Sequence, residues 1–319
     1  MIKHICFLFA LIVAAAVPAL ANEQCPPLKI LSSIDLTMAP NGIVTVPVTV
    51  AGEKTFFVLD TATSQSRISA ELVDKLHLVR EHSRVTLVNT RGHTSEEIAR
   101  IPTFGLGRLD YQSPSLWVMA EPAKPSGPQG VLGGDMLRNY DIDLDFAAHK
   151  MNIISREHCA DKVVYWQSTM LAKLQMVVGD DNRIIFDATL DGHDLTAVLA
   201  TGLVHSAINI SIAKRRLDVD ETSPGSVAVN ANNKDTLYLH RFGTLSFQDV
   251  TVNNPEILLM PDLAQKIPGA VLRGHDRFLA GLKMNQPELM VGMSTLKQLH
   301  VYIDYHNQTV YLTPAPPSP

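Results

Sequence analysis

The chain has few aromatic residues, few cysteines and no excess of basic charge, and each shortage excludes a class of protein. Its 319 residues carry 27 Lys and Arg against 32 Asp and Glu, so the net charge of -5 makes nucleic acid an unexpected partner. The three cysteines form no CxxC pair and no Cys/His cluster, and the 12 histidines are scattered, which favours surface or capping positions. We therefore expect no metal and no cofactor. A hydrophobic content of 46% excludes general disorder.

The only long apolar run lies at the amino terminus. Lys3 precedes an apolar stretch over 5–17, and Pro18 then leads into Ala19-Leu20-Ala21. This run is too short to span a bilayer comfortably and ends in a small-residue cleavage pattern. The sequence predicts a signal peptide over 1–21, and hence a secreted or periplasmic protein with no membrane span after cleavage.

Cleavage would leave two cysteines, Cys25 and Cys159. In an exported protein such a pair can form a disulfide, and the alternative of two unpaired thiols stays open. A bridge would close a long loop, worth on the order of 4 kcal/mol, and would place the end of a domain near residue 160.

An internal repeat organises the chain. The segment 52–62 reappears as 192–202, and the segment 132–146 reappears as 291–305. The two landmarks lie further apart in the second copy, which is therefore 19 residues longer, and the extra residues are expected within 254–286. Two landmarks repeated in the same order predict two related lobes.

We expect an amino-terminal lobe over 22–160, a carboxyl-terminal lobe over 161–313 and a Pro-rich tail over 314–319. Alternating apolar residues, Gly turns and short apolar runs predict a mainly β structure in which each lobe carries short helical segments. The first copy should contain a strand over 43–50, a strand over 56–59 buried on both faces, a helix capped by Ser69, a hairpin over 84–94, a helix at Gly133 and a closing hairpin over 142–154.

Asp60-Thr61-Ala62-Thr63-Ser64, directly after an apolar strand, resembles the active-site loop of the retropepsin-like and pepsin-like aspartic proteases. The segment Leu132-Gly133-Gly134-Asp135-Met136-Leu137 and the hairpin with Asp145 and Phe146 are similar to the second half of a bacterial retropepsin-like domain. The resemblance covers both lobes. It implies an all-β fold of two tandem retropepsin-like (acid protease) β-barrel lobes, and the activity of an aspartic-type endopeptidase on a peptide or protein substrate.

The resemblance also assigns roles to individual residues. Asp60 would be the catalytic carboxylate, Thr61 the hydrogen bonder between loops, Ala62 the small residue that lets two loops approach, and Ser64 a support for the carboxylate. Such enzymes use two carboxylates about 3 Å apart that share one proton, because two like charges so close cannot both ionise. One carboxylate activates a water while the protonated partner polarises the scissile carbonyl.

By the same resemblance, the hairpin over 85–94 would be the flap that closes over substrate. It includes Val88, Asn89 and Gly92. Substrate peptides would add along the strands and this flap.

The second copy departs from the pattern, because its loop reads Ala200-Thr201-Gly202. If the two lobes pair within one chain, Asp60 has no carboxylate with which to share a proton. No other aspartate is an obvious replacement; those considered are Asp135, Asp145, Asp187, Asp191, Asp194 and Asp304. Three hypotheses follow: an endopeptidase whose homodimer supplies Asp60 from each chain, a peptide-binding module of degenerate protease fold, or a scaffold. We expect the endopeptidase, because Asp60, Thr61 and Ser64 are intact; Ala200 favours the binding module, which is the alternative.

Overall fold

The structure is a computed structural model. It describes six stretches of the chain, which are 26–88, 94–160, 162–179, 182–231, 235–261 and 287–315. The predicted signal peptide and most of the Pro-rich tail lie outside the described residues. Within those stretches no helix has both the length and the apolar character that a membrane span requires.

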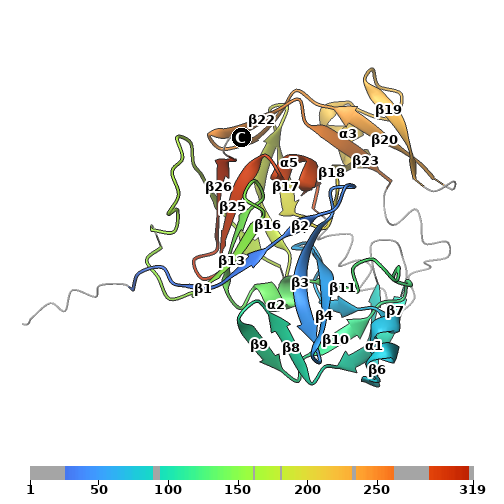
Figure 1. Cartoon of the computed structure of the whole chain (residues 1–319). Coiled ribbons are helices and arrows are strands. Elements are labelled where there is room, and N and C mark those ends of the chain that lie inside the picture. The colour runs from blue at the N-terminus through green and yellow to red at the C-terminus, as the bar shows by residue number, and fades with distance from the viewer. Residues whose placement is uncertain are drawn as a thin grey trace, which may run out of the picture.

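Strands dominate, and two ten-stranded sheets curl into two lobes (Figure 1). The sheet of the first lobe runs in the order β6 (Val79–Val88), β7 (Thr94–Arg100), β10 (Ser115–Val118), β5 (Arg67–Ile68), β11 (Gly130–Leu132), β4 (Glu53–Leu59), β3 (Val44–Val50), β8 (Thr103–Leu106) and β9 (Leu109–Gln112), with β2 (Thr37–Met38) beside β3. The sheet of the second lobe runs in the order β19 (Ser226–Ala231), β20 (Asp235–Arg241), β23 (Glu256–Met260), β18 (Ser206–Asn209), β24 (Leu289–Val291), β17 (His193–Leu199), β16 (Ile184–Leu190), β21 (Thr244–Phe247) and β22 (Val250–Asn253), with β15 (Val177–Val178) beside β16.

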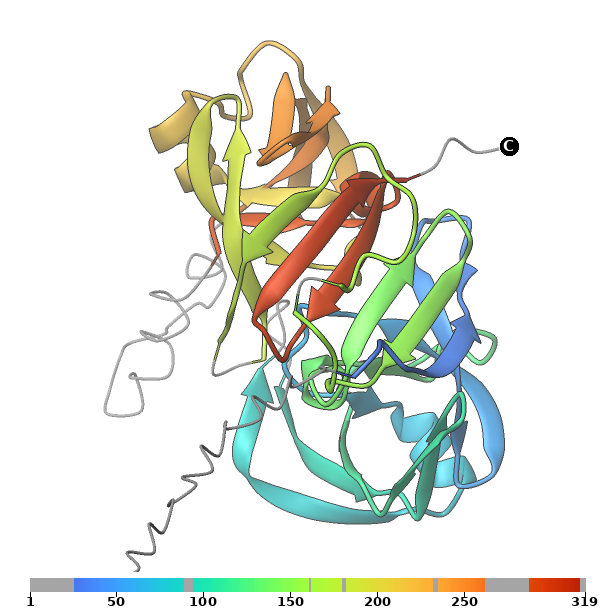
Figure 2. The same cartoon turned by 90° about the vertical axis from the view of Figure 1, so that its left-hand side faces the viewer.

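A third sheet of six strands joins the two halves. Its order is β1 (Ile30–Asp35), β13 (Lys150–Ile154), β12 (Asp141–Asp145), β25 (Leu299–Asp304), β26 (Thr309–Pro314) and β14 (Ala172–Gln175). The halves meet where β12 pairs antiparallel with β25, and Figure 2 shows these green and red strands side by side. Ile142 and Ile303 on this sheet belong to the main hydrophobic core, which continues into both lobes. The joining sheet therefore fixes the lobes to one another.

The repeat in the sequence is a repeat in the structure. The alignment that matches Thr61 with Thr201 also matches β3 with β16, β4 with β17, and α1 (Ala70–Lys75) with the start of α3 (Ile210–Leu217). The alignment that matches Gly133 with Gly292 also matches α2 (Gly134–Leu137) with α5 (Met293–Leu296). The second copy is longer in the segment between β23 and β24, which spans 261–288, whereas the corresponding segment of the first copy spans only 119–129. Most of the longer segment, 262–286, lies outside the described residues.

The local predictions are confirmed in part. Ser69 caps α1, since its hydroxyl accepts a hydrogen bond from the Leu72 amide at 3.1 Å. The prediction that the strand over 56–59 is buried on both faces is wrong, because Phe56 is 48% exposed while Phe57 and Leu59 are fully buried. The curled sheet of the first lobe encloses its core on one side only, so β4 alternates as an ordinary half-buried strand does.

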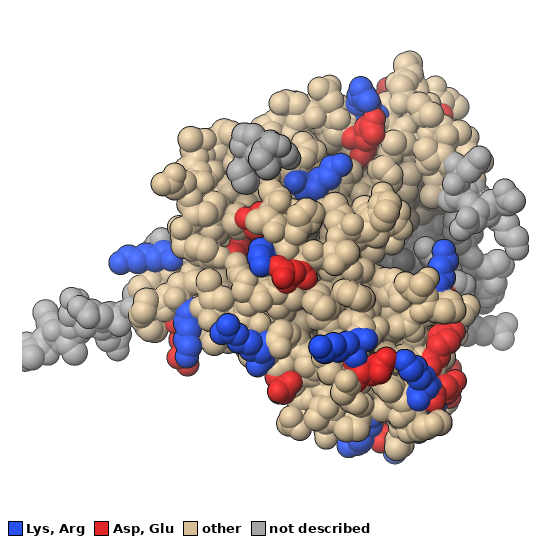
Figure 3. Space-filling view, viewed as in Figure 1, with Lys and Arg blue, Asp and Glu red and all other residues tan. Residues whose placement is uncertain are grey.

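Charge on the surface is mixed rather than segregated. On the face shown in Figure 3, basic and acidic side chains are interspersed and no continuous basic track is present. Exposed ion pairs contribute to this pattern, for example Lys75 with Glu53 at 2.7 Å and Arg241 with Glu256 at 2.7 Å.

Candidate active site

The Asp60 loop and the Ala200 loop occupy equivalent places in the two lobes. Each follows a strand that pairs in parallel with a short neighbour, β4 with β11 and β17 with β24. The Asp60 amide donates to the Leu132 carbonyl at 3.0 Å, and the Ala200 amide donates to the Val291 carbonyl at 2.9 Å. The same backbone pattern therefore forms both loops, with or without an aspartate.

Two buried threonines lock the loops together. The Thr61 hydroxyl donates to the Leu199 carbonyl at 2.7 Å, and the Thr201 hydroxyl donates to the Leu59 carbonyl at 2.8 Å. Each hydroxyl also accepts the other residue's amide, at 3.0 Å for Thr61 N and 3.2 Å for Thr201 N. Both side chains are fully buried, so these bonds are shielded from water. Thr61 thus makes the contact between loops that the sequence predicted.

The Asp60 carboxylate is held by its own loop. Its Oδ1 accepts the Ala62 amide at 3.0 Å, and its Oδ2 accepts the Thr63 hydroxyl at 2.5 Å. Thr63, rather than the predicted Ser64, supports the carboxylate, because the turn that bonds the Thr63 amide to the Asp60 carbonyl at 3.2 Å brings Thr63 back beside Asp60. Ser64 instead faces the second lobe, where its carbonyl accepts from the Asn182 side chain at 3.0 Å. Arg67 donates to the Thr63 hydroxyl at 3.2 Å and so extends the chain of hydrogen bonds.

The second loop lies directly against this carboxylate. A Cβ atom added to Gly202 would be 2.3 Å from Asp60 Cγ, so only glycine fits there. Ala200 is fully buried and supplies a methyl group where the aspartate of the first loop has a carboxylate. The two loops therefore present one carboxylate, and the interlock with Thr201 occupies the side of the Asp60 loop that a second chain would need for the predicted homodimer.

A family model described as aspartyl protease matches residues 46–136. This match lies within the first lobe. Among solved structures, the chain resembles the aspartic proteinase from Irpex lacteus, with a TM-score of 0.53 and 12% identity over 91% of this chain and 98% of that one. It also resembles basic 7S globulin from soybean, with a TM-score of 0.50 and 10% identity over 90% of this chain and 96% of that one. No curated protein matches the sequence. These likenesses extend the two-lobed fold beyond the family match, across both lobes.

The predicted flap of the first lobe is the hairpin of β6 and β7. Val88 pairs with Thr94 at its described end, and the register shifts between His82 and Leu87. Asn89 and Gly92 lie outside the described residues. Their part in closing over a substrate stays a prediction.

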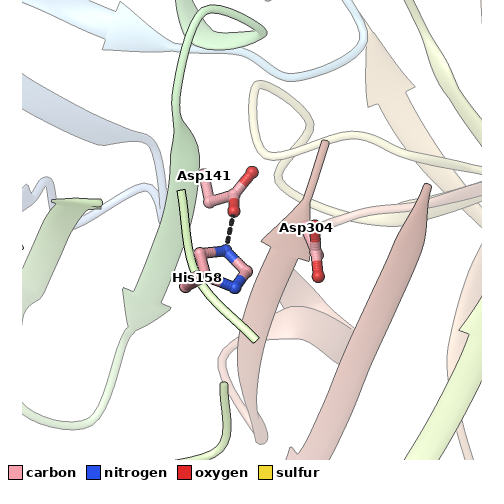
Figure 4. A group of neighbouring side chains, drawn as sticks. All are labelled: Asp141, His158 and Asp304. Carbon is pink, nitrogen blue, oxygen red and sulfur yellow. Dashed lines mark hydrogen bonds and ion pairs between the residues drawn. The ribbon is translucent and has the colours of Figure 1, made fainter. Parts of the chain in front are cut away.

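A buried cluster of two aspartates and one histidine lies at the joining sheet, and the sequence did not predict it. Asp141, His158 and Asp304 offer atoms within 4.8 Å of one another at the joining sheet, and Figure 4 shows His158 bonded to Asp141 with Asp304 beside them. Burial raises the pKa of the Asp141 carboxyl, and the hydrogen bond from His158 opposes this rise. The Asp141 carboxylate also accepts the Tyr305 amide at 2.8 Å. The three side chains therefore lie close enough to ligate one metal ion, but hydrogen bonds within the protein already satisfy the Asp141 carboxylate.

A second buried pair of a histidine and a carboxylate, His300 and Asp143, lies on the same joining sheet. Trp166 stacks on His300 with ring centroids 3.8 Å apart, and His300 Nε2 lies 2.5 Å from Asp143 Oδ1. His158, His240 and His300 are buried, so the prediction that the histidines lie at surface or capping positions is wrong for these three. His300 pairs with Asp143 of a strand 157 residues away, which spacing does not reveal.

The predicted disulfide is tested at one end only. Cys159 is disulfide-bonded, and its sulfur lies 4.0 Å from the Pro26 carbonyl oxygen. Cys25 lies outside the described residues, so the identity of the pair stays a prediction.

Proposed function

We propose that the protein is a peptide-binding module of aspartyl protease fold whose second lobe completes the fold without completing the catalytic pair. One observation carries the proposal: Ala200 lies in a loop whose Thr201 forms hydrogen bonds with Thr61 and Leu59 of the first lobe. The loop keeps its structural contacts while its carboxylate is absent. The match of residues 46–136 to a family model described as aspartyl protease supports a peptide as the ligand.

The chemistry of the pair supports binding over cleavage. Peptide hydrolysis by this route needs one carboxylate that accepts a proton from water and one that donates a proton to the carbonyl. Asp60 receives hydrogen bonds from Ala62 and Thr63 and has no carboxyl neighbour in the opposite loop. It can accept a hydrogen bond from a bound water or a peptide amide. An extended peptide can also form main-chain hydrogen bonds with the exposed edge of a sheet.

The second candidate is an exported aspartic-type endopeptidase. The complete Asp60 loop, with its amide and hydroxyl donors in place, favours it. A second chain would have to supply the missing carboxylate after the Thr61–Thr201 interlock opened. The cost of breaking that buried set of hydrogen bonds counts against this candidate.

The deciding experiment compares the parent protein with Ala200→Asp. Cleavage of an unfolded protein is assayed across acidic pH, and binding of a statine-containing peptide is measured by calorimetry. We expect the parent to bind without cleavage and Ala200→Asp to bind the statine peptide at least about tenfold more tightly, which is a gain of about 1.4 kcal/mol. Asp60→Asn in the Ala200→Asp background is the matched control and should abolish the gain.

Two results would reverse the conclusion. Cleavage by the parent that disappears in Asp60→Asn and falls on dilution would establish the dimeric endopeptidase. Failure of Ala200→Asp to improve statine binding would show that the second loop does not face Asp60 as an active-site loop does.

Export is a separate proposal, supported by the pattern over 1–21. Sequencing of the mature protein from cell fractions should find Asn22 at the amino terminus in the secreted or periplasmic fraction. An intact Met1 in the cytoplasmic fraction would contradict it.

A further inference from the structure

A pocket of about 310 Å³ lies where a turn of the first lobe meets the second lobe. The turn precedes β3, and the opposite wall comes from the segment after Gly202 and from α5 with the residue that follows it. Its lining includes Gly42, Val204, His205, Met293, Ser294 and Lys297. A volume of this size lies at the lower end of the range of small-molecule sites.

The repeat places an equivalent junction on the other side of the molecule. The alignment that matches Thr61 with Thr201 also matches Gly42 with Asn182, and these two residues close the same kind of turn. Gly42 N donates to the Ala39 carbonyl at 2.8 Å, and Asn182 N donates to the Gly179 carbonyl at 2.8 Å. Both residues have a positive φ, 83° for Gly42 and 62° for Asn182, a conformation that asparagine tolerates better than most residues.

At the equivalent junction the side chain of Asn182 fills the space between the lobes. Arg138 donates to Asn182 Oδ1 at 2.6 Å, and Asn182 Nδ2 donates to the Ser64 carbonyl at 3.0 Å. Gly134 makes room, because a Cβ atom there would lie 2.9 Å from Asn182 Cβ. Asn182 is 6% exposed and therefore acts as a built-in occupant of this junction.

The pocket junction has no side chain at the position of Asn182, and Met293 stands there at the position of Gly134 and lines the pocket. Gly42 has no side chain, and a Cβ atom added to it would meet only Val204 Cγ1 at 3.5 Å, an ordinary contact. The alignment that matches α2 with α5 places Lys297 at the position of Arg138, so a cationic side chain stands at both junctions.

The charges of the two junctions differ. Asp135 of α2 corresponds to Ser294 of α5, so the acidic residue beside the first junction is replaced by a hydroxyl at the second. No residue that lines the pocket is acidic. Within the described part of the chain Lys297 makes no ion pair with an acidic side chain. Among the described residues, the exposed Lys297 therefore gives the pocket a positive charge with no acidic residue in its lining.

We propose that this pocket binds a carboxylate carried on a short aliphatic stem, the size of the asparagine side chain that fills the equivalent junction. The carboxylate would accept hydrogen bonds from Lys297, and its stem would pack against Val204 and Met293. A free small acid and an aspartyl side chain share this chemistry. A charge-assisted hydrogen bond makes the carboxylate preferable to a neutral amide.

The test is a titration followed by the amide NMR signals of Gly42 and Val204, with acetate and N-acetyl-aspartate N-methylamide as probes. We expect saturable shifts with both probes if the source is a free acid, and with the aspartyl probe alone if the source is a peptide. N-acetyl-asparagine N-methylamide, the neutral isostere, should bind at least about tenfold more weakly, a difference of about 1.4 kcal/mol. Equal binding of the neutral isostere would overturn the choice of a carboxylate.

Three variants separate this site from non-specific binding. Lys297→Gln should weaken binding at least about tenfold and Lys297→Arg should retain it, because only the charge is needed. Gly42→Asn should abolish binding by supplying the occupant from the chain itself. Arg138→Gln at the equivalent junction is the matched control and should leave the affinity unchanged. No saturable shift in the parent, or full binding by Lys297→Gln or Gly42→Asn, would refute the proposal.

Discussion

Thr61 and Thr201 exchange hydrogen bonds across the boundary between the lobes, each amide donating to the other's hydroxyl at 3.0 Å and 3.2 Å. Each hydroxyl in turn donates to a backbone carbonyl of the opposite lobe, so all polar atoms of the interlock are paired. A loop in this arrangement has a structural role that does not depend on a neighbouring aspartate. This explains how the second loop can keep its place in the two-lobed fold with Ala200 at the position equivalent to Asp60.

Replacing Thr61 by valine should destabilise the protein by about 1–3 kcal/mol, because the buried Leu199 carbonyl and Thr201 amide lose their partner. Thr201→Val should have a similar effect, and the double variant should lose less than the sum. Urea unfolding measures each change. Thr55→Val, at a half-buried position of β4, is the control; an equal loss there would contradict a special role for the interlock.

Replacing Gly202 by alanine should displace the Asp60 carboxylate, since the new Cβ would lie 2.3 Å from Asp60 Cγ. The loss of the hydrogen bonds from Ala62 and Thr63 should lower the free energy of unfolding by about 1–3 kcal/mol and remove peptide binding. Calorimetry with a peptide ligand and urea unfolding report the two effects. Gly127→Ala in an exposed loop should change neither, and unaltered binding by Gly202→Ala would place the ligand away from Asp60.

The pH dependence of stability should contain a contribution from Asp141. Burial raises the pKa of this carboxyl, so the folded state holds its proton more tightly than the unfolded chain does. The contribution is most favourable at low pH and is lost as pH rises from the ordinary carboxyl range, about 4, through the raised value. Asp141→Asn cannot titrate and should flatten this part of the curve of unfolding free energy against pH. The exposed Asp187→Asn is the control, and an unchanged slope in Asp141→Asn would contradict the assignment.

Removal of the disulfide at Cys159 should destabilise the protein. If the partner is Cys25, the bridge closes most of the first lobe, and its loss should cost on the order of 4 kcal/mol. Peptide mapping without reduction identifies the pair, and urea unfolding of Cys25→Ala with Cys159→Ala measures the cost. Two free thiols in protein from an oxidising compartment would contradict the pairing.

Much of the fold could be predicted from the sequence, because the two copies of the repeat can be aligned and the signals for strands, turns and caps act over a short range. The alternation over 44–50, the Gly turns and the Ser69 cap act through neighbouring residues, and they predicted strands and a helix where the structure has them. The Asp60 loop was recognised for the same reason. The sequence predicts Ser64 as the support of the Asp60 carboxylate, whereas Thr63 has that role in the structure. The backbone dihedral angles of a tight turn decide which side chain returns to the carboxylate, and the sequence does not reveal those angles.

Only the tertiary structure decided which loops meet, and it did so through contacts between residues far apart in the chain. The sequence established that Ala200 replaces an aspartate, but not that the loop containing it would interlock with Thr61 of the same chain. Burial of His158 beside Asp141 and Asp304, and the empty place beside Gly42 that Asn182 fills at the equivalent junction, likewise depend on how strands from both halves join in one sheet. The local pattern fixes which faces of a strand are apolar, whereas the pairing of distant strands fixes which polar groups become neighbours and which spaces remain open.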